Sequence, residues 1–241
     1  MTFIKAVINA NQEVFSYLKN EGLMAKDYQS FDLGAGGDIS SGIDLEAEKI
    51  FIKYLSPFGT IISEESGEIA SSHEGIRIIL DPIDGSDNLL SHLPYFGTSV
   101  AYMQEGKCTQ AIITNLANGD IFIKNDEGFK RAHLMELAFK KVQKNPFSKV
   151  GIFERSYCSS KVLPKLHSLG LKYRSPGAFA LSLAYAHDVS FVLYEGKMRP
   201  YDIAAGMCMC EDLYTFMEDD IFLVSKDKET FDKIVSLFKS D

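Results

Sequence analysis

The sequence predicts a layered α/β protein, and the order of its periodic segments carries this prediction. In the first half, two helical patterns give way after about residue 60 to short β-branched strands, which indicates an antiparallel meander. In the second half, strands alternate with helical segments, an order typical of stacked helix and sheet layers. We therefore expect an N-terminal α+β half over residues 1–145 and a C-terminal α/β half over residues 146–241.

The first half opens with two amphipathic helices. Apolar residues recur at helical spacing over residues 4–18, where Gly22 is the expected end, and again over residues 43–54. The dipeptide Asn118-Gly119 predicts a two-residue hairpin turn between two strands. Short, apolar, β-branched runs predict the strands of this half at residues 60–62, 76–80, 97–103, 109–115 and 120–124.

The second half is expected to follow a junction at residues 140–148. Its predicted strands cover residues 150–153, 171–173, 189–194 and 221–225. Its predicted helices cover residues 160–169, 178–187 and 203–213, with an amphipathic helix from about residue 228.

Composition restricts the class of protein. Of 241 residues, 46% are hydrophobic and 24% charged, which is typical of a globular domain, and no apolar run approaches the roughly 18 residues of a membrane span. The N-terminus is too polar for a signal peptide, so we expect a cytoplasmic protein. The net charge of −8 argues against a nucleic-acid partner, because such binding depends on neutralising phosphates.

An acidic turn follows one of the predicted strands. Pro82 fixes its own backbone and keeps Asp81 extended, while Gly85 permits a sharp turn. Ser86 can cap a helix beginning there, and the free N–H groups of a helix start attract anions. The same residue types also make ordinary capped turns. If the turn forms a binding site rather than only a capped turn, the carboxylates of Asp81 and Asp84 can converge on one point.

Three other acidic segments have ordinary interpretations when each is taken alone. Glu64 and Glu65 follow a predicted strand, as solvated turns often do, whereas Asp44 and Asp202 begin helices. Convergence of these acids with the turn would bring buried carboxylates into mutual repulsion and raise their pKa values. Hard divalent cations remove that conflict, and ligation by oxygen alone favours Mg²⁺ over zinc.

These segments, in this order, resemble the inositol monophosphatase superfamily, which includes fructose-1,6-bisphosphatases and 3′-phosphoadenosine 5′-phosphate phosphatases. The similarity runs from about residue 38 to residue 206 and rests most on the motif DPIDGS at residues 81–86, followed by Asn88. It implies an alternating α-β-α-β-α five-layer sandwich of the sugar-phosphatase type, with a mixed sheet in the second half.

The resemblance implies two or three Mg²⁺ ions in one active site. One ion would be held by Glu64, Asp81 and the backbone carbonyl of Ile83. Asp81 would bridge to a second ion, which Asp84 and Asp202 would also hold.

The remaining roles are implied in the same way. Asp44 and the Ser86 hydroxyl would orient the attacking water beside Glu64, and Glu65 is a looser candidate ligand of a third ion. The implied contacts to the substrate come from Gly85, Ser86, Gly177, Ala178, Phe179 and Glu195.

The resemblance implies a Mg²⁺-dependent, Li⁺-sensitive phosphomonoesterase that hydrolyses inositol monophosphate or a related sugar phosphate through metal-activated water. Alternatives are a fructose-1,6-bisphosphatase, including a dual-activity enzyme, and a 3′-phosphoadenosine 5′-phosphate phosphatase. Tyr201 stands where the family usually has tryptophan before the last aspartate, a departure that bears on the substrate. A non-catalytic regulatory protein on the same scaffold is the alternative from another class. We expect a small phosphorylated partner and no membrane, and dimers among relatives make a homodimer one expected arrangement.

Overall fold

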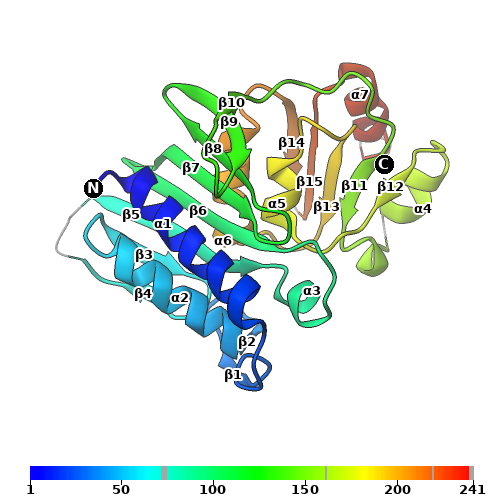
Figure 1. Ribbon diagram of the computed structural model, residues 1–241. Coiled ribbons are helices and arrows are strands. Elements are labelled where there is room, and N and C mark those ends of the chain that lie inside the picture. The colour runs from blue at the N-terminus through cyan, green and yellow to red at the C-terminus, as the bar shows by residue number, and fades with distance from the viewer. Residues whose placement is uncertain (72–74, 161, 219, 239–241) are drawn as a thin grey trace.

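The computed structural model describes residues 1–71, 75–160, 162–218 and 220–238 (Figure 1). The helices of the first half are α1 (Phe3–Ser16), a π-helical turn (Tyr17–Glu21), α2 (Gly42–Leu55) and α3 (Ser86–Leu90). Its strands are β1 (Ser30–Leu33), β2 (Ile39–Ser41), β3 (Thr60–Ser63), β4 (Gly67–Ile69), β5 (Ile76–Asp84), β6 (Gly97–Gln104), β7 (Lys107–Asn115), β8 (Asp120–Asn125), β9 (Gly128–His133) and β10 (Lys140–Lys141).

The second half mostly alternates between strand and helix as its periodicity predicts, except that an unpredicted strand, β14, directly precedes β15. Its strands are β11 (Gly151–Glu154), β12 (Tyr173–Arg174), β13 (Val192–Glu195), β14 (Tyr214–Glu218) and β15 (Ile221–Ser225). Its helices are a 3₁₀ turn (Ser156–Cys158), α4 (Val162–His167), α5 (Phe179–Ala184), α6 (Pro200–Met209) and α7 (Lys228–Ser236).

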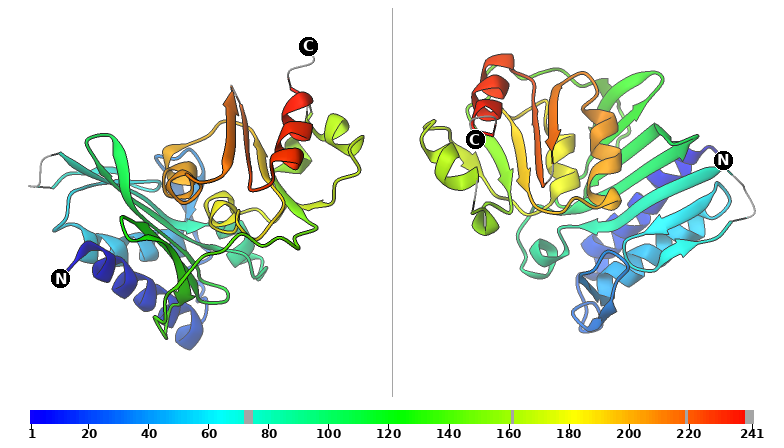
Figure 2. Two further views of the ribbon diagram at one scale, coloured as in Figure 1. Left: turned by 90° about the horizontal axis from the view of Figure 1, so that it is seen from above. Right: turned by 180° about the vertical axis from the view of Figure 1, so that it is seen from behind.

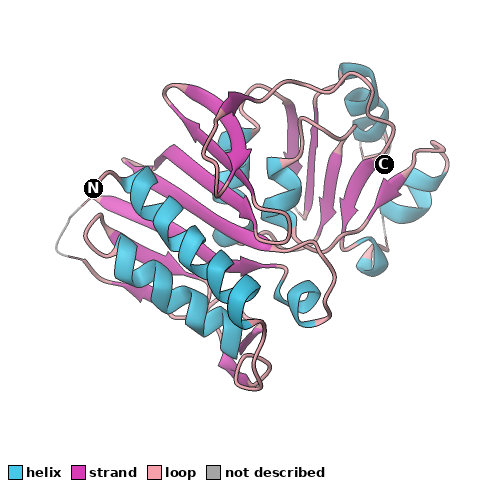
Figure 3. Ribbon diagram, viewed as in Figure 1, coloured by secondary structure: helices cyan, strands magenta, loops and turns pink. Residues whose placement is uncertain are grey.

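The elements stack in five layers, which confirms the predicted fold class (Figures 1 and 2). Helices α1 and α2 cover the outer face of an eight-stranded sheet, and α5 and α6 lie between that sheet and a five-stranded one. Helices α4 and α7 cover the far face of the second sheet. Figure 3 shows the alternation of helix and strand layers. Among the described residues, no helix is both long and apolar enough to cross a membrane.

The two sheets have the predicted characters. The first has the order β10-β9-β8-β7-β6-β5-β3-β4, is antiparallel from β5 to β10, and pairs β3 in parallel with β5. The second has the order β12-β11-β13-β15-β14 and is mixed, because β11 runs parallel to β12 and β13 while β15 is antiparallel to both neighbours. The predicted boundary between residues 145 and 146 falls between β10 of the first sheet and β11 of the second. The division of the chain into two halves at this point stays a prediction.

The predicted two-residue turn at Asn118-Gly119 is wrong. Strand β7 ends at Asn115 and β8 begins at Asp120, so residues 116–119 connect them. Only Gly119 of the dipeptide has a positive φ, of 81°, whereas a type I′ turn needs two such residues. The Asn115 side chain accepts hydrogen bonds from the backbone of Ala117 and Asn118 at 2.9 and 3.2 Å, and this capped loop replaces the tight turn.

A small hairpin was not predicted. Strands β1 and β2 pair antiparallel, with Leu33 opposite Ile39. Every residue of β1 is exposed, so the hairpin lacks the apolar alternation that marks a half-buried strand. Its connecting turn, residues 34–38, packs against the backbone of Glu64 and Glu65 and thereby reaches the functional site.

Candidate metal centre and active site

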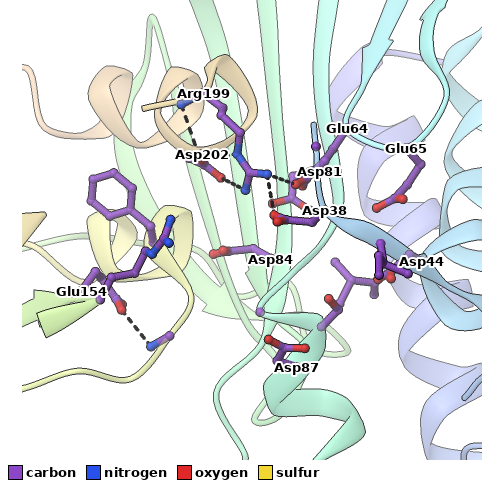
Figure 4. Close-up of a pocket in the computed structure, with 18 of the residues that line it drawn as sticks. Asp38, Asp44, Glu64, Glu65, Asp81, Asp84, Asp87, Glu154, Arg199 and Asp202 are labelled. Carbon is purple, nitrogen blue, oxygen red and sulfur yellow. Dashed lines mark hydrogen bonds and ion pairs between the residues drawn. The ribbon is translucent and has the colours of Figure 1, made fainter. Parts of the chain in front are cut away.

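A cavity of about 520 Å³ opens where the two halves meet, at the ends of β3, β5 and β11 (Figure 4). It contains every acidic residue that the sequence analysis assigned to metal binding, together with two arginines. The charged side chains that line it are Asp38, Asp44, Glu64, Glu65, Asp81, Asp84, Asp87, Glu154, Arg155, Arg199 and Asp202.

The end of β5 places both aspartates of the DPIDGS motif in this cavity. Residues three apart on a regular strand point to opposite faces of the sheet. Here Asp81 pairs with Ser99 of β6 and Asp84 with Gly97, so three steps on β5 match two on β6. This bulge contains Pro82, which has no N–H to donate, and it turns both carboxylates toward the cavity.

The turn after β5 approaches the second half closely. Gly85 has φ = 84°, a left-handed conformation that disfavours other residues. A Cβ at this position would lie 2.9 Å from the Cβ of Ala178, so glycine also provides the necessary space. Gly85 and Ser86 both line the cavity, where Ser86 begins the short helix α3.

Burial and mutual repulsion perturb the acids strongly. Burial, and then repulsion from Glu64 and Asp84, raise the pKa of Asp81 well above its ordinary value. Burial likewise raises the pKa of Asp84, despite a hydrogen bond from the Leu181 backbone N–H. Burial raises the pKa of Glu64 to about 7, although Arg199 opposes the shift. The cluster therefore gains from additional positive charge.

Two buried carboxylate oxygens have no hydrogen-bond partner among the described residues, namely Oδ1 of Asp81 and Oδ1 of Asp44. Such orphaned acceptors are costly unless a cation or water satisfies them. Together with the oxygen-only donor set, they fit a hard divalent ion such as Mg²⁺. Glu64, Asp81, Asp84 and Asp202 would hold it, with the Ile83 carbonyl within the same cavity lining.

Asp44 and Glu65 lie on the side of the cavity formed by the first half (Figure 4). Asp44 Oδ2 accepts hydrogen bonds from the backbone N and Oγ of Ser41, at 2.8 and 2.6 Å, and so caps α2. Its other oxygen stays unpaired. Glu65 accepts a short hydrogen bond from the Ser40 hydroxyl, and burial raises its pKa to about 7.

Arg199 is the functional residue that the sequence analysis missed. Its guanidinium contacts both oxygens of Asp202, at 3.0 and 3.1 Å, and Oε1 of Glu64 at 2.9 Å. Within the described part of the chain, no group of three or more Asp, Glu, His or Cys side chains is arranged to hold a metal ion, so the proposed ligands would have to shift to bind one. The available signal was its spacing, since i,i+3 pairs on a helix face each other.

The predicted substrate contacts are only partly brought together. Gly177 and Phe179 line the cavity, and Ala178 is buried beneath the loop. Glu195 is outside the cavity lining and accepts hydrogen bonds from Ser159 Oγ and the Val162 backbone. Because neighbouring strand residues face opposite ways, Tyr194 lines the cavity in its place.

Glu154, at the end of β11, is a second residue that sequence reasoning missed. It is almost fully buried and accepts hydrogen bonds from the backbone of Gly177 at 2.8 Å and of Ala178 at 3.4 Å, and from the Ser182 hydroxyl. These bonds fix the substrate-side loop beside the turn at Gly85. An acid within an apolar strand gives little signal in the sequence, but a buried acid always needs such partners.

Comparison with known proteins agrees with this geometry. The chain is 25% identical over 218 residues to the Nus factor SuhB of Escherichia coli K12, covering 83% of this chain and 81% of that one. It is 29% identical over 194 residues to a fructose-1,6-bisphosphatase of Pyrococcus furiosus, covering 78% and 72%. The extragenic suppressor protein SuhB of Bartonella henselae shares its fold, with a TM-score of 0.80, 20% identity and 99% coverage of both chains. A profile described as the inositol monophosphatase family matches residues 2–213, and the chain therefore belongs to the inositol monophosphatase family.

Proposed function

We propose that this protein is a Mg²⁺-dependent phosphomonoesterase that hydrolyses inositol monophosphate or a related sugar phosphate. The observation that carries the proposal is the convergence of Asp81, Asp84, Glu64 and Asp202 in one cavity, with an unpaired Asp81 oxygen among them. Membership of a phosphatase family supports it. Two or three Mg²⁺ ions per site, as the family resemblance implies, are part of the proposal.

The residues that line the cavity would have separate roles in the hydrolysis. Mg²⁺, when bound, supplies charge neutralisation for the phosphate and activates water. The unpaired oxygen of Asp44 is free to accept a hydrogen bond from the attacking water, since its other oxygen is held by Ser41. Gly85 and Ser86 line the same cavity, where the Ser86 hydroxyl and the two backbone N–H groups would orient water and phosphate.

The wall on the side of the second half suits a ring with hydroxyl groups. Phe179 and Tyr194 stack with ring centroids 4.4 Å apart and an interplanar angle of 13°, and both line the cavity. Both rings are almost fully buried, so they form a rigid apolar part of the wall beside acidic and basic side chains that can hydrogen-bond a polyol or sugar.

Fructose 1,6-bisphosphate is the second candidate substrate, favoured by the fructose-1,6-bisphosphatase among the relatives. The third is 3′-phosphoadenosine 5′-phosphate. The test is phosphate release from inositol 1-phosphate, fructose 1,6-bisphosphate and 3′-phosphoadenosine 5′-phosphate, each with Mg²⁺ and with EDTA. We expect Mg²⁺-dependent release that is fastest with one of the first two and is inhibited by millimolar Li⁺. Equal inactivity on all three would overturn the proposal.

A regulatory role without catalysis is the alternative from another class, and relatives named Nus factor SuhB favour it. The site acids Asp44, Glu64, Asp81, Asp84 and Asp202 are all present, which supports catalysis. The absence of a nucleic-acid partner, a cytoplasmic location and a homodimer stay predictions. Gel filtration coupled to light scattering tests the homodimer, and a fluorescence titration with single-stranded RNA tests the nucleic-acid prediction.

A further inference from the structure

Arg199 connects the candidate metal ligands to the turn of the β1–β2 hairpin, 163 residues away in the sequence. Nε and Nη2 form a fork on Asp202, and Nη1 reaches Oε1 of Glu64. The same Nη1 contacts Asp38 Oδ2 at 2.6 Å and the carbonyl oxygen of Gly36 at 3.1 Å. In Figure 4 the guanidinium lies between Asp202 and Asp38.

We propose that Arg199 is a tethered competitor of the metal ion: the guanidinium that contacts Asp202 and Glu64 must leave them before they can bind Mg²⁺. This inference rests on the proposed function and goes beyond it, because it assigns control of metal affinity to a residue that is not a ligand. It also predicts that the metal-binding and metal-free states differ in the position of one side chain.

The contacts themselves imply the competition. Both oxygens of Asp202 are occupied by the fork, which is the strong, bidentate form of a carboxylate contact. A guanidinium and a divalent ion repel each other, so the bound guanidinium disfavours an ion on the same carboxylate. The side chains of Asp202 and Glu64 are only 9% and 12% exposed, so water screens neither contact well.

Arg199 leaves part of the ligand set available. Asp84 accepts its hydrogen bond from the Leu181 backbone, and Oδ1 of Asp81 has no partner among the described atoms. These two carboxylates can therefore attract an ion while the guanidinium is still on Asp202. Completion of the ligand set is then the step that displaces Arg199.

The displaced side chain has an alternative partner. Asp38 is 78% exposed at its side chain and already contacts Nη1, so rotation toward solvent keeps that pair while releasing Asp202 and Glu64. The turn that carries Asp38 stays in place, because the backbone N–H groups of Ala35 and Gly36 bond to the carbonyls of Glu65 and Glu64 at 2.9 and 2.7 Å. The competitor therefore moves without unfolding its surroundings.

Calorimetric titration of Mg²⁺ into the metal-free protein tests the proposal, using wild type, Arg199→Gln, Arg199→Lys and the control Arg77→Gln. Arg77 forms an exposed ion pair with Glu68 and is not part of the cavity lining, so its variant should bind Mg²⁺ as wild type does. We expect Arg199→Gln to bind Mg²⁺ about tenfold more tightly, a difference of about 1.4 kcal/mol. Arg199→Lys should also bind more tightly than wild type, though less so, because lysine keeps the charge but loses the fork.

Thermal unfolding gives a second readout that does not depend on activity. Without metal, Arg199→Gln should unfold at a lower temperature than wild type, because the carboxylates lose their counter-charge. With saturating Mg²⁺ the difference should close or reverse. If Arg199→Gln does not fold, the Mg²⁺ affinity and unfolding temperature of Arg199→Lys are compared with those of wild type instead.

The outcomes separate the two claims. Mg²⁺ affinities of both Arg199 variants equal to or weaker than wild type would overturn the competition while leaving the proposed function standing. Wild-type protein that binds no Mg²⁺ in the calorimeter would overturn the proposed function, and the competition with it.

Discussion

Asp84 on β5 accepts a hydrogen bond from the backbone N–H of Leu181 on α5, with Oδ2 and N 2.6 Å apart. The two residues are 97 positions apart in the sequence and come from opposite halves of the chain. A single carboxylate thus joins the first sheet to the helix layer and lines the cavity at the same time. The hydrogen bond stabilises this contact, whereas burial of the carboxylate raises its pKa and makes its negative charge unfavourable.

Asp84→Asn should stabilise the metal-free protein. The amide oxygen can still accept from Leu181, whereas the buried negative charge and its repulsion of Asp202 are removed. We expect the free energy of unfolding at pH 8 in EDTA to rise by about 1 kcal/mol, within the range of substitutions that relieve functional strain. Urea denaturation measures it. If the variant has a lower free energy of unfolding than wild type, the interactions lost with the carboxylate outweigh the gain from removing its buried charge.

Asp44→Asn should separate the capping role of this residue from its role toward water. Asparagine keeps an oxygen that can accept from Ser41, so the free energy of unfolding should fall by less than about 1 kcal/mol. Phosphate release should fall about 10²-fold or more, because the amide positions water less effectively than the carboxylate. The control is Ser41→Ala, which weakens the cap and should mainly lower stability. Near-normal release by Asp44→Asn would assign this residue to capping alone.

Glu154→Gln should loosen the loop that faces the substrate. Glutamine offers one acceptor oxygen where Glu154 uses two, so one of its donors from Gly177, Ala178 or Ser182 meets an amide N–H instead. We expect a stability loss of about 1–3 kcal/mol and a rise in KM that exceeds any fall in kcat. Ser182→Ala removes one donor and should have a smaller effect. A fall in kcat alone would contradict a positioning role.

The metal-free protein should lose stability as pH rises. Burial raises the folded-state pKa of Glu64 and of Glu65 from 4.5 to about 7. The folded state therefore holds protons that the unfolded state has released, so this stability is complete below about pH 4.5 and lost as pH passes 7. In EDTA, the unfolding temperature should be lower at pH 8 than at pH 5.5. Glu65→Gln should flatten the dependence, and an unfolding temperature that rises over this range would contradict the assignment.

The sequence predicted the strand-to-helix turn at residues 81–86, because Pro82 restricts the backbone and Gly85 permits the left-handed turn. The predicted capping role of Ser86 is wrong, since Gly85 is the N-cap of α3 and the helix begins at Ser86 without a side-chain cap. It also predicted the layered architecture from the change of period near residue 60. The bulge on β5 was beyond reach, since it depends on the pairing with β6. That pairing decides whether both aspartates face the cavity.

Other errors have local physical causes. The Asn118-Gly119 dipeptide predicted a tight hairpin, but the Asn115 side chain competes for the same backbone donors and builds a longer loop. The assignment of Glu195 to the substrate stays a prediction, since Glu195 is outside the cavity lining while its neighbour Tyr194 lines it. Arg199 was missed although its i,i+3 spacing from Asp202 was visible, because its tertiary contacts with Glu64 and Asp38 cannot be read from spacing.

The most direct test of the metal centre is Mg²⁺-dependent phosphate release by Asp81→Asn, measured beside wild type on whichever sugar phosphate the wild-type protein hydrolyses fastest. Asp81 is the ligand proposed to bridge two ions, and its change to a neutral amide keeps the size of the side chain. We predict that release falls to the level seen in EDTA, while circular dichroism shows a folded protein. Mg²⁺-dependent release at the wild-type rate from Asp81→Asn would contradict the assignment of this cluster as the catalytic metal site.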